Sequence, residues 1–225
     1  MKVAEAGYPS RKIAVDEDSG ARFVAALLQR GLSDGPQRPA IICDGEVLSY
    51  EELGRASIIV AWHFARLGLS AGHRLALLLP PGRWLLPLLL GALHRGLLVS
   101  IFSVSLDPQA RAFRLAPLRP DLVLDDEEQL FRLPERPTVS APTAPGPGLL
   151  VWTADSTGQP RGVVLTPEAL LLEVQVSAAE RSHQSTNRAP VVLDADHCRI
   201  LIQQTFAPLF VGATVVIRLP SDTSC

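Results

Sequence analysis

Residues 75–104 read LALLLPPGRWLLPLLLGALHRGLLVSIFSV, which is an apolar run of strand length, a Pro-Pro-Gly turn, a longer apolar stretch and a second short apolar run. These lengths and turn residues predict a strand at 75–79, a helix from about 83 to 94 and a strand at 98–104. Two strands joined through a helix lie parallel in a right-handed βαβ unit. Because both strands are apolar at consecutive positions, we expect helices to cover both faces of their sheet.

Helices and strands continue to alternate on both sides of this unit. Capping residues, turn residues and apolar spacing predict these elements in chain order: a helix from Ser19 to about 30 that ends at Gly31, a hairpin of 40–43 and 46–49 around Asp44-Gly45, a mostly buried helix at 50–67, a helix from Asp107 to about 118, and a strand at 121–124. This order predicts an α/β fold with a mainly parallel sheet and helices on both faces. In that sheet, 75–79, 98–104 and 122–124 are expected to be neighbouring parallel strands.

A proline-rich stretch at 132–148 (RLPERPTVSAPTAPGPG) interrupts this alternation and is typical of a loop. It divides the chain into a first α/β subdomain at 1–131 and an incomplete second subdomain at 149–225. In the second part, the pattern predicts a helix at 167–181, a polar segment to Arg188, a helix around 200–211 and a strand at 214–217.

Residues 151–166 (VWTADSTGQPRGVVLT) place a polar turn of small residues between two apolar strands. In such a turn, backbone N–H groups and hydroxyl groups can converge on phosphate oxygens while a cation neutralises their charge. Ser156, Thr157 and Arg161 are suited to those contacts. The alternative is a plain hairpin turn, because Asp, Ser, Gly and Pro are common turn residues. The glycine spacing fits neither a Walker loop nor a nucleophile elbow around Ser156.

The turn STGQPRG at 156–162 resembles the ATP-phosphate loop of the adenylate-forming family, whose usual form is close to SGSTGxPKG. That family includes acyl-CoA synthetases, luciferases and peptide-synthetase adenylation domains. The resemblance covers roughly residues 20–219, because three further stretches match the family in the same order: LSYEEL at 48–53, GALHRG at 91–96 followed by LDP at 106–108, and APLFVGATVV at 207–216.

The resemblance implies the N-terminal subdomains of a ligase that activates carboxylic or amino acids with ATP and Mg²⁺. The residues that match the family's loop would then bind the phosphates: Thr153, Ser156, Thr157, Gly158, Arg161 and Gly162. Three departures predict weak ATP binding, because Ala154 replaces a hydroxyl residue, Asp155 a glycine and Arg161 a lysine. Arginine can still bind phosphate in a bidentate manner. Asp155 sets a carboxylate beside several negative charges, and unless Mg²⁺ bridges them this charge opposes ATP.

Several groups that the family uses for adenylation have no counterpart in this sequence. They are an aromatic-Gly-x-Thr-Glu segment that packs on adenine, an aspartate that binds ribose, and a C-terminal lysine that stabilises the transition state. One wall of the family's acyl pocket also has no counterpart, because Gln203-Gln204-Thr205-Phe206 runs straight into Ala207.

Adenylation depends on positioning and on electrostatic stabilisation of charge. We therefore expect a truncated, weakly catalytic or non-catalytic chain that serves as a structural or docking module, and we assign no catalytic residue. The alternatives are half of a split or longer active acyl- or aminoacyl-adenylating enzyme, and a simple nucleotide-binding module.

The family covers the face formed by residues 200–217 with later sequence. We therefore expect an exposed apolar face there, which binds a completing polypeptide, a carrier protein or a second copy of the chain. The formal net charge of −2 and the scattered arginines exclude nucleic acid and an anionic membrane surface as partners.

Neither the cysteines nor the acidic residues predict a metal site. The three cysteines lie far apart without ligand spacing, which also argues against a disulfide framework. The N-terminus lacks the apolar core of a secretory signal, and Pro80 and Pro81 interrupt the most apolar stretch, so we expect a cytoplasmic protein. Four neighbouring residues have the composition of a metal site, but their close spacing is more typical of a solvated turn: Asp194, Asp196, His197 and Cys198.

Overall fold

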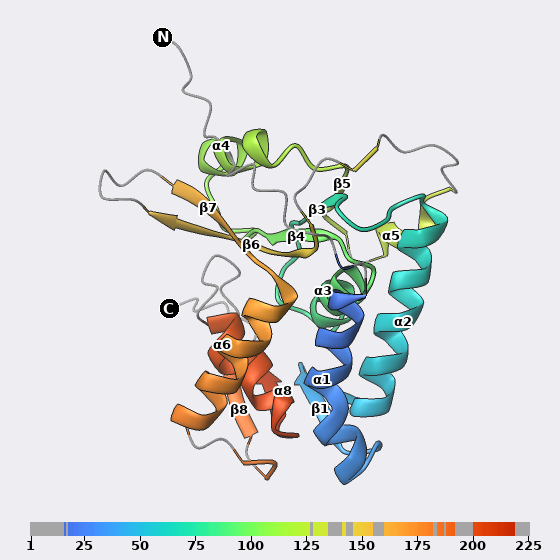
Figure 1. Ribbon diagram of the computed structural model, residues 1–225, viewed down its shortest axis with the longest axis vertical. Coiled ribbons are helices and arrows are strands. Elements are labelled where there is room, and N and C mark those ends of the chain that lie inside the picture. The colour runs from blue at the N-terminus through green and yellow to red at the C-terminus, as the bar shows by residue number, and fades with distance from the viewer. Residues whose placement is uncertain are drawn as a thin grey trace.

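The structure is a computed structural model. It describes residues 16, 18–126, 128–134, 141–142, 146–154, 160–181, 184–186, 188–191 and 200–218. The first sheet contains β1 (Pro39–Cys43), β2 (Glu46–Ser49), β8 (Arg188–Val191) and β9 (Thr214–Ile217). The second contains β3 (Arg74–Leu77), β4 (Leu98–Ile101), β5 (Leu122–Leu124), β6 (Gly148–Ala154) and β7 (Pro160–Leu165). The strand orders are β2-β1-β9-β8 and β5-β3-β4-β6-β7. Figure 1 shows the second sheet in the upper half of the view and strands β1 and β8 of the first sheet in the lower half.

The helices alternate with these strands along the chain. They are α1 (Ser19–Asp34), α2 (Tyr50–Arg66), α3 (Leu85–His94), α4 (Pro108–Leu118), α5 (Gln129–Arg132), α6 (Pro167–Glu180) and α8 (Ala207–Phe210), which directly follows a π-helical turn, η1 (Leu201–Phe206). In the part of the chain with described structure, no helix combines the length and the apolar character needed to cross a bilayer.

The second sheet confirms the predicted parallel strands. β3 pairs in parallel with both β4 and β5, and β4 pairs in parallel with β6. The remaining strand of this sheet, β7, is antiparallel because it forms a hairpin with β6. β4 ends at Ile101, so the strand expected to reach residue 104 is shorter than predicted.

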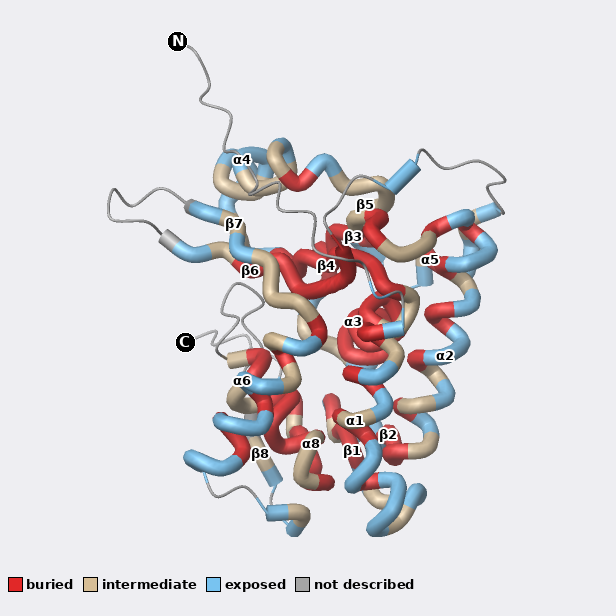
Figure 2. Tube along the Cα trace, in the orientation of Figure 1, coloured by how far each residue is buried: buried red, intermediate tan, exposed pale blue. Residues whose placement is uncertain are grey.

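Helices cover both faces of this sheet, as the sequence predicts. Successive side chains of a strand point to opposite faces. Leu75 and Leu77 of β3 therefore join the core cluster that contains α1, α2 and α3, whereas Ala76 packs in a second cluster with Leu118 of α4. Figure 1 shows α4 apart from the three other helices, and Figure 2 shows β3, β4 and α3 buried along most of their length.

Helix α1 does not end at Gly31, and this expectation is wrong. The helix continues to Asp34, because Gly31 serves for close packing rather than as a stop. A Cβ atom at Gly31 would lie 2.2 Å from Cε1 of Tyr50. The missing side chain leaves room for the tyrosine ring at the start of α2. The prediction failed because sequence position alone does not distinguish a glycine that ends a helix from one that allows close packing.

The exposed apolar face expected at residues 200–217 is not found in the described part of this segment. Leu201, Phe206 and Leu209 are buried, and β9 lies between β1 and β8 with Val215 and Ile217 buried. The segment is covered because α1 and α6 pack on η1 and α8. Four apolar residues of the segment are only half-buried, namely Ile200, Phe210, Val211 and Val216, and a partner at this segment stays a prediction.

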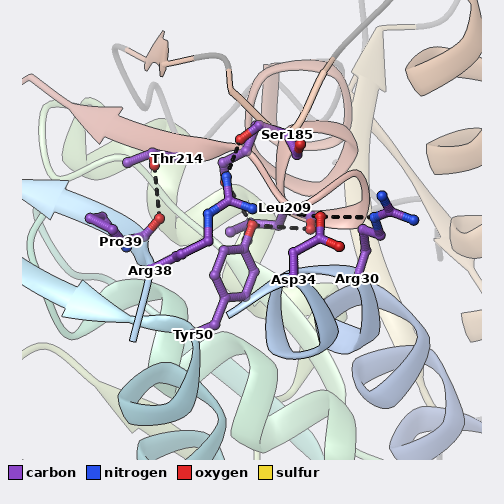
Figure 3. Close-up of polar contacts among 9 residues, drawn as sticks. Arg30, Asp34, Arg38, Pro39, Tyr50, Ser185, Leu209 and Thr214 are labelled. Carbon is purple, nitrogen blue, oxygen red and sulfur yellow. Dashed lines mark hydrogen bonds and ion pairs between the residues drawn. The ribbon is translucent and has the colours of Figure 1, made fainter. Parts of the chain in front are cut away.

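Both sheets combine strands from the two sides of the proline-rich stretch. β1 pairs with β9, and β4 pairs with β6. Polar contacts reinforce this arrangement (Figure 3): the Tyr50 hydroxyl donates to the carbonyl oxygens of Ala213 (2.6 Å) and Leu209 (3.2 Å), and Thr214 Oγ1 donates to Pro39 O at 2.8 Å. The division at 132–148 remains a prediction, but the parts it names share both sheets.

Candidate functional site

The hairpin of β6 and β7 holds the polar loop of the sequence at one edge of the second sheet. Its register runs from Leu149 opposite Leu165 to Ala154 opposite Pro160, so residues 155–159 connect the two strands. Because β6 is parallel to β4, this loop leaves the sheet at the carboxyl ends of the parallel strands. Ligands of open α/β sheets bind at that edge.

Thr153 and Arg161 form a cross-strand pair directly before and after the loop. The Thr153 hydroxyl donates a hydrogen bond to the Arg161 carbonyl oxygen at 3.3 Å, and both residues are exposed. No acidic residue of the described ranges forms an ion pair with the Arg161 guanidinium. A guanidinium at this position can neutralise phosphate charge and bind two phosphate oxygens at once.

Gly162 lies against the ring of Trp152 on the neighbouring strand. A Cβ atom at Gly162 would approach Leu150 Cδ1 to 3.1 Å and Trp152 Cζ3 to 3.6 Å. The glycine thus allows the indole to lie close to the hairpin backbone. This close contact fixes the strand that leads out of the loop.

A buried hydroxyl supports the strand that leads into the loop. The indole N–H of Trp152 donates to Ser100 Oγ at 3.1 Å, and Ser100 Oγ donates to the carbonyl oxygen of Leu150 at 3.1 Å. Ser100 belongs to β4 and is fully buried. Ser100 is not among the predicted site residues, although a single hydroxyl within the apolar stretch LLVSIF is a signal for such a role.

The structure brings Thr153, Arg161 and Gly162 together at the base of the loop. Ser156, Thr157 and Gly158, like Asp155, lie outside the described residues, and their roles stay predictions. The group at 194–198 also lies outside them. Within the described ranges, no three His, Cys, Asp or Glu side chains are grouped to hold a metal ion. With an exposed guanidinium beside a hydroxyl, the described arrangement can hold an anion.

Comparison with known proteins shows the family to which this chain belongs. A model of the family described as AMP-binding enzyme matches residues 28–144, which is just over half of the chain. Sulfoacetate–CoA ligase from Cupriavidus necator is 26% identical over 233 residues, an alignment that covers 89% of this chain and 46% of that ligase. The chain thus spans about half the length of this relative.

Solved structures share the fold. The N-terminal subdomain of NpsA from Klebsiella oxytoca, in complex with 3-hydroxyanthranilyl-AMSN, matches with a TM-score of 0.72 at 15% identity over 89% of this chain and 53% of its own. ATP-bound MatB from Rhodopseudomonas palustris matches with a TM-score of 0.72 at 16% identity over 87% of this chain and 44% of its own. By its match to the family model and by its fold, this chain belongs to the AMP-binding enzyme family and has the architecture of the N-terminal subdomain of an adenylate-forming enzyme.

Proposed function

We propose that this chain supplies the phosphate-binding part of a ligase that activates a carboxylic or amino acid with ATP, and that it binds ATP·Mg²⁺ weakly by itself. The observation that carries the proposal is the β6–β7 hairpin, which sets Thr153 and Arg161 side by side at the carboxyl edge of the parallel strands. The hairpin's loop has the family's STG sequence. The fold shared with ATP-bound MatB supports the same interpretation.

Each residue of the loop has a distinct part in this proposal. Arg161 provides the positive charge, and the hydroxyls of Ser156 and Thr157 provide donors for phosphate oxygens. Gly158 and Gly162 let the backbone come close to the ligand and to Trp152. Binding is weak because Asp155 brings a negative charge into the loop, which Mg²⁺ offsets only in part.

Asp155 and Ala154 also favour a second function, which is a structural or docking module that keeps the fold without adenylation. An aspartate beside the phosphates reduces affinity, and the lost hydroxyl at position 154 removes a donor. Such a module would bind its partner protein through surfaces other than the loop. The two functions differ in whether a carboxylic acid is activated.

Calorimetric titration with ATP·Mg²⁺ tests the phosphate site. We expect weak binding by the wild type, tighter binding by Asp155→Gly because repulsion is removed, and loss of binding by Arg161→Ala. The matched control is Arg30→Ala, which removes an exposed arginine on α1 that pairs with Asp34 at 2.9 Å. If Arg161→Ala binds as the wild type does, or if Asp155→Gly shows no gain, the phosphate site is wrong.

Pyrophosphate exchange over a broad panel of carboxylic and amino acids separates the two functions. Exchange by the wild type, alone or with an added second polypeptide, supports the ligase. Binding of ATP without exchange under any of these conditions supports the module instead.

A further inference from the structure

Helix α2 carries an apolar stripe on its outer face. Ile58, Ile59 and Trp62 are 59%, 46% and 55% exposed, and their spacing of three and four residues places them together on one side of the helix. The inner face is apolar as well, with Val60 and Phe64 buried. The expectation of a mostly buried helix is therefore only half correct, because α2 lies at the outside of its layer (Figure 2).

The charges of α2 are opposite at its two ends. Glu51 and Glu52 lie in the first turn, and Arg66 ends the helix. The Arg66 guanidinium lies over the Trp62 ring, 4.7 Å from its centroid, so that the stripe ends in a stacked cation. Partial burial and the nearby Arg66 lower the pKa of His63, which favours its neutral form. The outer face thus runs from the first turn, where Glu51 pairs with Arg55 at 2.6 Å, through the apolar stripe to Arg66 at the basic end.

Aromatic side chains extend the basic end of the stripe. The His63 ring lies edge-on to Trp62 at 5.1 Å and to Phe131 of α5 at 4.9 Å, and Phe131 lies edge-on to Trp84 at 5.5 Å. Tryptophan and arginine are enriched at the centres of protein interfaces. The composition of this face therefore fits a protein surface as its partner.

The face is complementary to itself when two copies run in opposite directions. Glu52 and Arg66 each lie about two helical turns from Ile59, roughly 10 Å along the axis. In an antiparallel pair centred on Ile59, Glu52 of each copy faces Arg66 of the other. Ile58, Ile59 and Trp62 then meet at the centre, and the two helix dipoles oppose each other favourably.

We propose that the outer face of α2 is the interface of a symmetric homodimer, in which two α2 helices pack antiparallel around Ile59. The occupant of the apolar stripe is a second copy of this chain, because the antiparallel arrangement brings the two apolar stripes together and sets Glu52 of each copy opposite Arg66 of the other. One helix face supplies roughly a few hundred Å², which is less than the roughly 800 Å² per partner of a standard interface. The dimer is accordingly weak and reversible.

Sedimentation equilibrium of the full chain over a concentration series tests the dimer. We expect the average mass of the wild type to rise from monomer toward dimer, and Ile59→Asp to weaken association at least about tenfold, because a buried unpaired charge at the centre of an interface is costly. Leu172→Asp is the matched control, because Leu172 is a comparably large apolar residue, 62% exposed, on α6. A wild type that stays monomeric up to millimolar concentration overturns the proposal, and so does association that Leu172→Asp abolishes and Ile59→Asp leaves unchanged.

A charge exchange tests the antiparallel register. In a dimer of Arg66→Glu alone, two acidic side chains face each other at both ends of the helix pair, and in a dimer of Glu52→Lys alone, two basic side chains do. Each variant should therefore be monomeric. Mixed together, the two variants form the wild-type pair of Glu52 and Arg66 at one end of an antiparallel pair and the exchanged pair at the other, so a heterodimer should form. A parallel register would set like charges opposite each other in the wild type itself, so association of the wild type and its loss in each single variant identify the antiparallel register.

Circular dichroism shows whether each of these variants is folded. Folded variants that do not associate on mixing, while the wild type dimerises, would show that the register is wrong. The residues of this interface lie apart from the β6–β7 hairpin, so loss of ATP binding leaves the proposal unaffected.

Discussion

Tyr50 is completely buried, and its hydroxyl is a polar contact between the start of α2 and the turn before β9 (Figure 3). The ring fills the space left by Gly31, and the hydroxyl donates chiefly to the carbonyl oxygen of Ala213 at 2.6 Å, with a longer contact of 3.2 Å to that of Leu209. Burial raises the pKa of Tyr50 above its ordinary value of 10.0. A single side chain thus joins α1, α2 and the segment between α8 and β9.

We predict that Tyr50→Phe lowers the free energy of unfolding by about 1–2 kcal/mol at neutral pH, because the Ala213 carbonyl oxygen loses the donor that lies 2.6 Å from it, whereas the Leu209 carbonyl oxygen still accepts from the Gly212 N–H. The loss should shrink at high pH. Tyr50 ionises near its ordinary pKa in the unfolded chain but resists ionisation in the folded chain. The free energy of unfolding of the wild type therefore falls as the pH rises above about 10. The variant has no hydroxyl at position 50 to ionise, so its free energy of unfolding does not fall for this reason. Urea unfolding of both proteins from about pH 7 to 11 measures the difference, and a difference that grows with pH would contradict the prediction.

At the scale of elements, glycines set how closely the helices pack. A Cβ atom at Gly91 of α3 would lie 2.5 Å from Val60 Cγ1 and 2.7 Å from the carbonyl oxygen of Ser57, both on α2. At Gly54 of α2, the nearest atom would be Leu28 Cδ1 at an ordinary 3.7 Å. Both glycines lie within helices, but a side chain would clash at Gly91 and would fit at Gly54.

We predict that Gly91→Ala costs about 1–3 kcal/mol of stability, because the new methyl group forces α2 and α3 apart. Gly54→Ala is the control. It should be neutral or stabilising by up to about 1 kcal/mol, because alanine favours the helix and the site has room. Denaturant unfolding measures both changes. Equal effects of the two substitutions would show that α2 and α3 do not pack as described.

At the scale of the whole molecule, the first sheet depends on both ends of the described chain. β9 lies between β1 and β8, and its side chains Val215 and Ile217 are buried. A central strand has hydrogen-bonded neighbours on both sides. Its loss would therefore expose two strand edges and part of the core.

We predict that a chain ending at residue 212 loses cooperative thermal unfolding, whereas a chain ending at residue 218 retains it. The shorter chain lacks β9 and with it the strand that joins β1 to β8. Circular dichroism and calorimetry of the two chains compare them directly. A cooperative transition in the shorter chain would mean that the first sheet does not depend on β9.

The sequence by itself determined the local elements and the order in which they alternate. Asp44-Gly45 forms the predicted hairpin turn, with φ angles of 50° and 79° that few other residue pairs adopt readily. The apolar runs at β3, β4 and β5 are buried or partly buried parallel strands as expected. The strand that leads into the loop and the strand that follows it are also where the sequence places them. These features depend on short-range backbone preferences and on the periodicity of apolar residues, which one sequence carries in full.

Only the tertiary structure decided which segments lie beside one another. β8 is a four-residue edge strand with the sequence RAPV. Because it contains an arginine and a proline, it lacks the apolar pattern by which strands are predicted. The sequence did not show that other segments of the chain cover the apolar residues of 200–217. It also did not show that some apolar residues of α2 face outward. Thr153 and Arg161 became neighbours through the hairpin register, and Ser100 joined them through its bond to Trp152. An apolar residue is equally apolar whichever neighbour covers it, so burial is decided by long-range contacts that a single sequence does not specify.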